Sequence, residues 1–486
     1  MPLLATLTEM AREAGIEAYV VGGTVRDVLL GRATRDVDVV VGGDALAWAR
    51  RAADRLGGHF VVLDDVHAVA RVVLPEPSKV YVDVAALQGT LDQDMRRRDF
   101  TIDALAAPLG ESRVLDLCGG LADLDAGVVR MNEIEVLDAD PLRLLRAARV
   151  ASELGFEIEP ATAEAIRARA PRVNEAAAER RRDELARILA LDEVEPALRL
   201  LDWLGLLAAL LPELTLGKGV TQPEQFHAYD VFEHNVRSVG AMDAMLARAR
   251  PAGEGAMLWE GLWRWFGWCE ETLRAYLAEE TSEGRSRAAV LKLATLLHDV
   301  SKPQTRSVED DGRVRFFGHA DAGADTAKRI MRRLRFSTRE TGFVVKLVAE
   351  HLRPVQLAPA GEVPTRRALY RFYRTLGDAA PAVLLLALAD AAGARGPEMT
   401  AEGWSRQVAY MNSLLARSVE DEGIVQPPRL LSGRDIMTAL GVPEGPVVGR
   451  LLEALREAQA AGEVQSREEA LAFVKELARE GPGSGR

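Results

Sequence analysis

The chain has 486 residues, enough for several domains, and 48% of them are hydrophobic, which supports ordinary buried cores. No apolar run approaches the roughly 20 residues of a membrane span, and charged side chains near the N-terminus argue against a signal peptide. Two cysteines, Cys118 and Cys269, are too few for a disulfide framework or a cysteine zinc site. We therefore expect a cytoplasmic protein without membrane segments.

The net charge of −12 argues against a uniformly basic surface. Nucleic-acid binding depends on local patches, however. Arginines gather at residues 96–98, 143–149, 167–187 and 329–339. Each run is either a solvated helix face or a phosphate-binding surface.

A strand, a turn and a helix are predicted near the N-terminus. The apolar run Tyr19–Val21 indicates a buried strand, and Gly22 and Gly23 indicate a turn. Thr24 is expected to cap a helix that ends at Gly31. A glycine turn that opens a helix presents bare N–H groups to phosphate.

Two carboxylates follow on the next predicted strand. Asp36 and Asp38 are two residues apart and therefore share one face of it. Paired carboxylates offer the hard oxygen ligands that suit Mg2+. With the glycine turn, they predict a metal-dependent site that acts on a nucleoside triphosphate. Asp83, on a predicted strand at 80–85, is either a third acidic group there or an ordinary strand-end aspartate.

The fold class is predicted to be α+β. Residues 1–128 mix strands and helices, with a helix at 45–56 and a strand pair at 60–63 and 68–74. From about residue 138 onward the chain is predicted to be almost all helical. We therefore expect a mixed sheet with helices, followed by a helical remainder.

A second acid–base pair lies where this helical part begins. Asp140 and Arg143 are three residues apart on one helix face. They form either an ion pair or a donor–acceptor set that addresses the pairing edge of cytosine or adenine.

Several of these segments resemble class II nucleotidyltransferases, which include CCA-adding enzymes and bacterial poly(A) polymerases. The matching segments are GGTVRDVLLG followed by DVD, RRDFTIDAL at 97–105, the glycine turn at 116–124, DPLR at 140–143 and the charged helix at 175–190. The resemblance implies that Asp36 and Asp38 are catalytic and bind Mg2+. It also implies a nucleotide-binding set that comprises Gly22, Gly23, Arg26, Arg98, Asp99, Asp140, Arg143 and Arg146.

Within that set, Arg98 and Asp99 would read the sugar hydroxyl, and Asp140 and Arg143 would select C and A. The chain departs from the family pattern at two positions. Asp103 stands where the family has Asn, and Ala139 stands where it has Glu.

A second resemblance lies further along the chain. Histidines and aspartates recur on helical segments in the order of an HD phosphohydrolase domain, which binds divalent metal. The implied ligands, for a transition metal such as Mn2+, Ni2+ or Co2+, are His234, His298, Asp299, His319, His351 and Asp390. His227 is a poor ligand candidate because no motif accompanies it.

These resemblances predict four parts. They are a nucleotidyltransferase head at 1–128, a helical neck at 129–215, an HD-type domain at 216–425 with a tryptophan-rich insertion at 251–287, and a helical tail at 426–486. The predicted activity is template-independent addition of CMP and AMP, from CTP and ATP, to the 3′ end of tRNA, by two-metal transfer. An additional phosphohydrolase activity of the HD-type domain is also expected.

Alternatives remain open. They are an enzyme that adds only CC or only the terminal A, a poly(A) polymerase, and an HD phosphohydrolase with an RNA-binding head. The expected partners are tRNA and the two nucleotides, without DNA or membrane, and the protein is expected to be a monomer or homodimer.

Overall fold

The computed structural model describes residues 2–75, 80–223, 227–282, 284–357, 363–421, 425 and 427–480. The chain divides into two compact units, which are described separately. The first unit comprises Met1–Ile188 and Pro196–Leu210, and the second comprises Leu189–Glu195 and Leu211–Arg486.

A seven-stranded mixed sheet forms the centre of the first unit, in the order β3-β4-β5-β2-β1-β6-β7. Only β2 and β5 pair in parallel, and the other neighbours are antiparallel. The strands are β1 (Ala18–Val21), β2 (Asp36–Val41), β3 (His59–Asp64), β4 (Val69–Val73), β5 (Tyr81–Ala86), β6 (Leu105–Pro108) and β7 (Leu115–Asp116). This sheet confirms the predicted mixed architecture.

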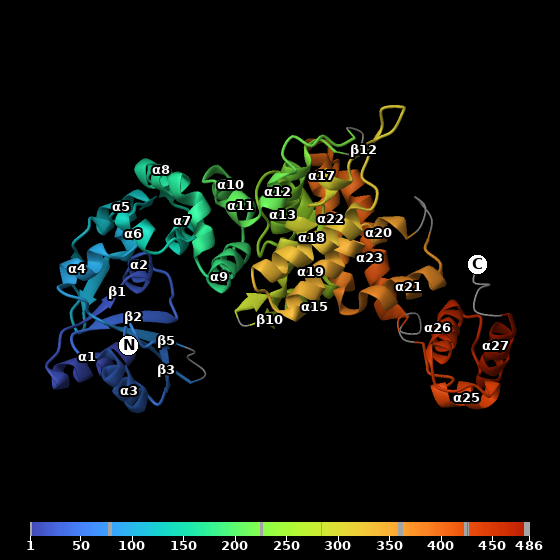
Figure 1. Ribbon diagram of the computed structural model, residues 1–486, viewed down its shortest axis with the longest axis horizontal. Helices are drawn as coiled ribbons and strands as arrows, with labels where there is room; N and C mark the ends of the chain where they lie inside the picture. Colours follow the sequence, from blue (N-terminus) through green and yellow to red (C-terminus); the bar gives the residue numbers. More distant parts are fainter. Residues whose placement is uncertain are drawn as a thin grey trace. The chain divides into compact units, whose positions relative to one another are not determined.

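The two faces of this sheet differ in what covers them. Val37, Val39 and Val41 of β2 point into a core that includes α1 (Pro2–Ala14) and α3 (Ala45–Leu56). Because strand side chains alternate, Asp36 and Asp38 point to the opposite face. Figure 1 shows α2 (Gly23–Leu29) on the other side of the sheet from α1 and α3.

Helices complete the first unit. They are α4 (Leu91–Arg96), α5 (Gly120–Ala126), α6 (Glu135–Ala139), α7 (Leu142–Leu154), α8 (Pro160–Arg169), α9 (Ala178–Leu189), α10 (Glu195–Trp203) and α11 (Leu206–Leu210). A short parallel pair, β8 (Val128–Val129) with β9 (Glu157–Ile158), interrupts the helical region. Leu142, Leu145 and Val150 of α7 are buried and contribute to its apolar stripe.

The second unit is mostly helical. Its helices are α12 (Pro212–Thr215), α13 (Val231–Leu246), α14 (Glu254–Phe266), α15 (Glu270–Ala278), α16 (Arg287–Leu297), α17 (Lys302–Thr305), α18 (His319–Arg333), α19 (Thr338–Glu350), α20 (Arg353–Gln356), α21 (Arg366–Leu376), α22 (Ala380–Arg395) and α23 (Ala401–Glu420). Two small hairpins accompany them, β10 (Glu280–Ser282) with β11 (Arg285–Ser286), and β12 (Ser307–Val308) with β13 (Val314–Arg315).

Helix α22 lies at the centre of this unit and packs against α13 (Figure 1). Residues 366–395 contain an 18-residue window that is apolar enough to resemble a membrane span, but 72% of that window is buried inside the protein. Because α22 is apolar around its whole circumference, burial in a protein core accounts for its composition.

The C-terminal helices form a small bundle with a core of its own. They are α25 (Gly433–Leu440), α26 (Pro446–Ala461) and α27 (Arg467–Glu480). Ser432 caps α25 and forms a reciprocal capping box with Asp435.

Candidate active site and metal centre

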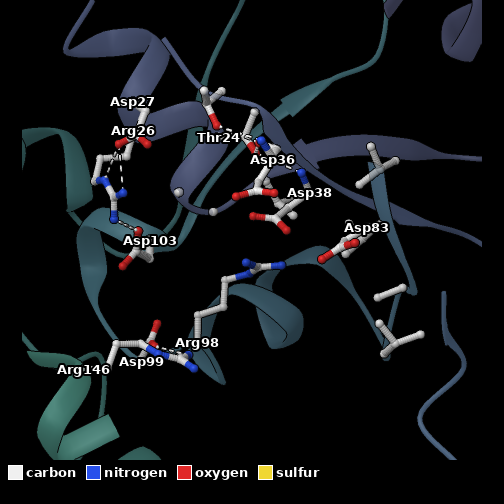
Figure 2. Close-up of a pocket in the computed structure, with 18 of the residues that line it drawn as sticks. Thr24, Arg26, Asp27, Asp36, Asp38, Asp83, Arg98, Asp99, Asp103 and Arg146 are labelled. Atoms are coloured by element: carbon white, nitrogen blue, oxygen red, sulfur yellow. Dashed lines mark hydrogen bonds and ion pairs between the residues drawn. The ribbon is translucent and has the colours of Figure 1, made fainter. Parts of the chain in front are cut away.

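The paired aspartates of β2 lie beside a third carboxylate. Asp38 and Asp83 are register partners on the parallel strands β2 and β5, and both line the same cavity. Figure 2 shows Asp36, Asp38 and Asp83 on neighbouring strands at one side of that cavity. The Asp83 carboxylate accepts two hydrogen bonds from Arg71, at 2.7 and 2.8 Å. Of the two readings of Asp83, its position supports membership of the acidic group.

Thr24 does not cap α2, so that prediction is wrong. The helix begins after Gly22 and has no side-chain cap. The Thr24 hydroxyl instead donates to the Asp36 carbonyl (3.2 Å) and accepts from the Asp38 amide (2.8 Å). This residue therefore links the start of α2 to the strand that carries both carboxylates.

Gly22 has a backbone conformation, φ +70°, that side-chain-bearing residues rarely adopt. A Cβ at this position would lie 2.7 Å from Nη1 of Arg98 and 3.6 Å from Oδ2 of Asp38. The absence of a side chain therefore lets the Arg98 guanidinium approach the turn and the carboxylates.

The cavity has a volume of about 460 Å³, within the range of small-molecule sites. The predicted residues that line it are Gly22, Gly23, Arg26, Asp36, Asp38, Arg98, Asp99 and Arg146. Asp140 and Arg143 are not among the lining residues. Arg149 and Arg187, which we did not single out, also line the cavity. Both lie in the arginine runs noted above, which were the only sequence signal for them.

The carboxylates carry a charge that the protein does not fully compensate. Burial raises the pKa of Asp38 to about 6, and Asp83, Asp36 and Asp103 add to the increase, while Arg98 opposes it. A divalent cation would offset this cost and would find oxygen ligands on adjacent side chains. The acidic group therefore fits a hard cation such as Mg2+.

Arg26 is occupied by two acidic side chains. Its Nη1 lies 2.6 Å from Oδ1 of Asp103, and its Nη2 lies 2.8 Å from Oδ1 of Asp27 (Figure 2). Burial raises the pKa of Asp103 to about 6, although Arg26 opposes the increase. The carboxylate of Asp103 thus partly neutralises the arginine expected to hold triphosphate.

Arg98 and Asp99 point in different directions, although they are adjacent in sequence. Arg98 extends toward Asp38, whereas Asp99 accepts a 3.0 Å hydrogen bond from Arg146 (Figure 2). Nε of Arg98 has no hydrogen-bond partner within the described part of the chain. Arg98 also lies 3.6 Å from Oδ2 of Asp94, so it is a cation near the carboxylates that keeps part of its donor capacity for a ligand.

The expected base-selecting pair has a third member. Arg180 of α9 binds both carboxylate oxygens of Asp140, at 2.7 and 3.2 Å. Arg143 instead donates to the Val136 carbonyl at 3.1 Å. The sequence indicated only a charged helix around Arg180, and it gave no sign of this contact with a residue forty positions away.

Six histidine and aspartate side chains converge in the second unit. Asp299 belongs to two groups of ligand atoms, one with His234, His298 and Asp390, and the other with His319 and His351. Nε2 of His234 lies 3.1 Å from both Nε2 of His298 and Oδ1 of Asp390. Ligands of one ion at 2.1 Å lie roughly 3.0–3.4 Å apart in octahedral or tetrahedral geometry.

The hydrogen bonds of three histidines orient them for metal binding. Nδ1 of His298, His319 and His351 contacts the carbonyl three residues earlier, at 2.7–2.8 Å. If Nδ1 donates, Nε2 of each ring keeps a free lone pair, which is the usual arrangement of a metal-binding histidine. Oδ1 of Asp299 and Nε2 of His319 have no hydrogen-bond partner within the described residues. The donor set therefore fits a divalent transition metal.

Two further residues border this centre. Lys302 lies 2.5 Å from Oδ2 of Asp299 and also donates to Gln222. His227 packs edge-on against His234, with ring centroids 4.9 Å apart, but it is not in either converging group.

Comparison with known proteins identifies the domains in which the two sites lie. Three family models match, the poly A polymerase head domain at residues 18–130, the probable RNA and SrmB-binding site of polymerase A at 155–216, and the HD domain at 271–394. A solved structure described as a CCA-adding enzyme with ATP has a TM-score of 0.61 at 22% identity, and covers 100% of this chain and 95% of its own. This similarity concerns the fold.

Two curated relatives match almost end to end. An A-adding tRNA nucleotidyltransferase of Deinococcus radiodurans is 38% identical, over 96% of this chain and 97% of its own length. A CC-adding tRNA nucleotidyltransferase of Thermus thermophilus is 35% identical, over 94% and 93%. The fold and site define a nucleotidyltransferase with a poly(A)-polymerase-type head. The chain belongs to the tRNA nucleotidyltransferase family.

Proposed function

We propose that this chain adds CMP and AMP to the 3′ end of tRNA that lacks CCA, without a nucleic-acid template. The observation that carries the proposal is the placement of Asp36 and Asp38 on one strand face beside the Gly22 turn and the 460 Å³ cavity. The full-length relatives that act on tRNA support the choice of substrate.

Within this proposal the side chains have separate tasks. Asp36 and Asp38 would hold Mg2+, which when bound stabilises the triphosphate and acidifies the attacking hydroxyl. The Gly22–Gly23 turn and Arg98 would bind phosphate, and Asp99 would be held toward the sugar by Arg146. Asp140, Arg143 and Arg180 would select the base, with Asp140 accepting from the exocyclic amine of cytosine or adenine.

The test uses three tRNAs, which end at the discriminator base, at the first two added C residues, and at complete CCA. Each is incubated with labelled CTP, labelled ATP or both. Full CCA addition predicts C incorporation on the first tRNA, A on the second and none on the third. Absence of incorporation on the first two would refute nucleotidyl transfer to tRNA.

A partial activity is the second candidate, because the two relatives described above are an A-adding and a CC-adding enzyme. An A-adding enzyme would extend only the second tRNA, and only with ATP. A CC-adding enzyme would extend the first tRNA and stop after two residues. A poly(A) polymerase would instead add many adenylates to all three tRNAs.

The second unit supports an additional hydrolytic function. We infer that His234, His298, Asp299, His319, His351 and Asp390 hold a transition metal such as Mn2+, Ni2+ or Co2+, which when bound activates water toward phosphate esters. Hydrolysis of a 2′,3′-cyclic nucleotide with each metal in turn tests this function. No hydrolysis and no bound metal would reduce the centre to a structural role.

The remaining parts of the proposal concern the domain division, the cellular location and the oligomeric state. We retain the four-part division at residues 128, 215 and 425, and assign the tail to tRNA contact. We also propose a cytoplasmic enzyme, monomeric or homodimeric, that uses neither DNA nor membrane. Size-exclusion chromatography with light scattering determines the oligomeric state.

A further inference from the structure

One face of α21 carries four arginines. The helix reads RRALYRFYRTL and has no acidic residue, and its arginines are Arg366, Arg367, Arg371 and Arg374. At 100° per residue these four side chains fall within an arc of roughly 140°, so they form one continuous basic face. We call these four residues the α21 arginine face. It lies outside the arginine runs noted in the sequence.

Acidic side chains of the C-terminal bundle cover this face. Arg371 lies 2.6 Å from Glu457, and Arg367 lies 3.2 Å from the same carboxylate. Arg374 pairs with Glu453 at 3.1 Å. Figure 1 shows α26, which carries both glutamates, next to α21.

Two more contacts extend the acidic cover. Arg367 also pairs with Glu463 at 2.7 Å, and Arg366 pairs with Asp421 at 2.6 Å. Every arginine of the face therefore contacts at least one carboxylate.

These ion pairs lie at the surface, where water and dissolved ions can compete with the carboxylates for the arginines. The arginine side chains are 44–62% exposed. Their carboxylate partners are 19–51% exposed, and ion pairs toward the exposed end of this range contribute only about 0–1 kcal/mol each. Polyanionic RNA binds such arginines with release of counterions, which favours its binding at low salt. Phosphates can therefore replace the carboxylates at the arginines, and release of α26 also breaks the hydrogen bonds from Tyr370 to Glu453 and from Arg366 to the Ala460 carbonyl.

We propose that the α21 arginine face binds the sugar–phosphate backbone of tRNA, and that the carboxylates of α26 occupy the phosphate positions when RNA is absent. Binding of RNA exchanges Glu453 and Glu457 of α26, and Glu463 just beyond its end, for phosphates and releases α26 from α21. This inference rests on the proposed action on tRNA, and it adds a binding surface outside the active site.

The test measures binding of labelled tRNA lacking CCA to the full-length protein at several KCl concentrations. Arg371→Gln is expected to reduce the slope of log K against log salt by roughly 0.7–0.9, the contribution of one phosphate contact. Its matched control is Arg406→Gln on α23, whose side chain is 76% exposed, and this variant should leave the slope unchanged.

A second variant, Glu457→Gln, is expected to strengthen tRNA binding. Glu457→Gln should raise tRNA affinity by more than Glu402→Gln, which removes the same charge from an 84% exposed side chain of α23. The gain should disappear when Arg367 and Arg371 are also changed to Gln, because the uncovered arginines produce it. Amide hydrogen exchange in α26 should become faster when tRNA is added.

Three results would overturn the proposal: equal salt slopes for Arg371→Gln and wild type, equal affinities for Glu457→Gln and Glu402→Gln, or unchanged exchange in α26. Extension of the same tRNA by wild-type protein is measured in parallel. If wild type extends tRNA and these variants bind normally, the proposed function survives and the α21 surface does not.

Discussion

Replacement of Asp103 by Asn tests how the Asp103 carboxylate affects the binding of triphosphate by Arg26. Asp103 and Asp27 both contact Arg26, and the exposed fractions of Asp103 and Arg26 are each 8%. Asn keeps the shape and an oxygen acceptor but removes one negative charge. Arg26 then presents more of its positive charge to the triphosphate.

The size of the effect follows from the difference between two hydrogen bonds. A hydrogen bond that involves charged groups contributes about 1.5–3 kcal/mol and a neutral one about 0.5–1.5 kcal/mol. Roughly 1–2 kcal/mol of attraction between Arg26 and Asp103 therefore becomes available to the triphosphate. This corresponds to about a 5- to 30-fold lower KM for CTP or ATP.

The assay is steady-state extension of tRNA at varied nucleotide concentration and pH 7.5. Asp92→Asn is the matched control, because Asp92 is an exposed residue of the same unit that pairs with Arg96, and it should leave KM unchanged. An unchanged or higher KM for Asp103→Asn would refute the reasoning that Asp103 limits triphosphate binding.

Three further predictions concern stability, base choice and the metal centre. The pKa of Asp38 is raised from 3.8 to about 6, so the native state binds protons more tightly than the unfolded state, and stability falls as pH rises through this window. Asp38→Asn should therefore stabilise the protein at pH 7.5 in EDTA by on the order of 3 kcal/mol, and it should abolish nucleotide transfer. Chemical denaturation followed by circular dichroism measures the free energy of unfolding. A lower free energy of unfolding for the variant would contradict the raised pKa of Asp38. Arg180→Ala should lower the ratio of kcat/KM for CTP to kcat/KM for UTP, because it frees the Asp140 carboxylate to rotate. The control Arg172→Ala, which removes a contact with Asp138, should leave this ratio unchanged. Equal ratios in both variants would exclude Arg180 from base choice. His298→Ala with Asp299→Ala should remove metal-dependent phosphoesterase activity and leave Mg2+-dependent nucleotide addition intact, and loss of both activities in a folded variant would show that the sites are not separable.

The sequence predicted local features well. Strand alternation placed Asp36 and Asp38 on one face, and Val37, Val39 and Val41 confirm that alternation by facing the core on the other side. The capping box at Ser432 and the helices of the C-terminal bundle likewise follow from neighbouring residues. These features depend on contacts within a few positions of the chain.

The features that the sequence did not predict arise from long-range contacts. Arg26 meets Asp103 across 77 positions, and Arg180 meets Asp140 across 40. Thr24 was misassigned for a related reason. A threonine at a helix start usually caps the helix, but here its hydroxyl bonds to a strand twelve to fourteen residues away. Such partners follow from the packing of the sheet against its helices, which single-sequence patterns do not specify.

The most direct test of the central claim is the number and identity of nucleotides added to tRNA ending at the discriminator base. Wild-type protein with CTP, ATP and Mg2+ should add C, C and A and then stop, and Asp38→Asn should add none. Equal addition by wild type and Asp38→Asn would contradict the assignment of chemistry to the paired aspartates of β2.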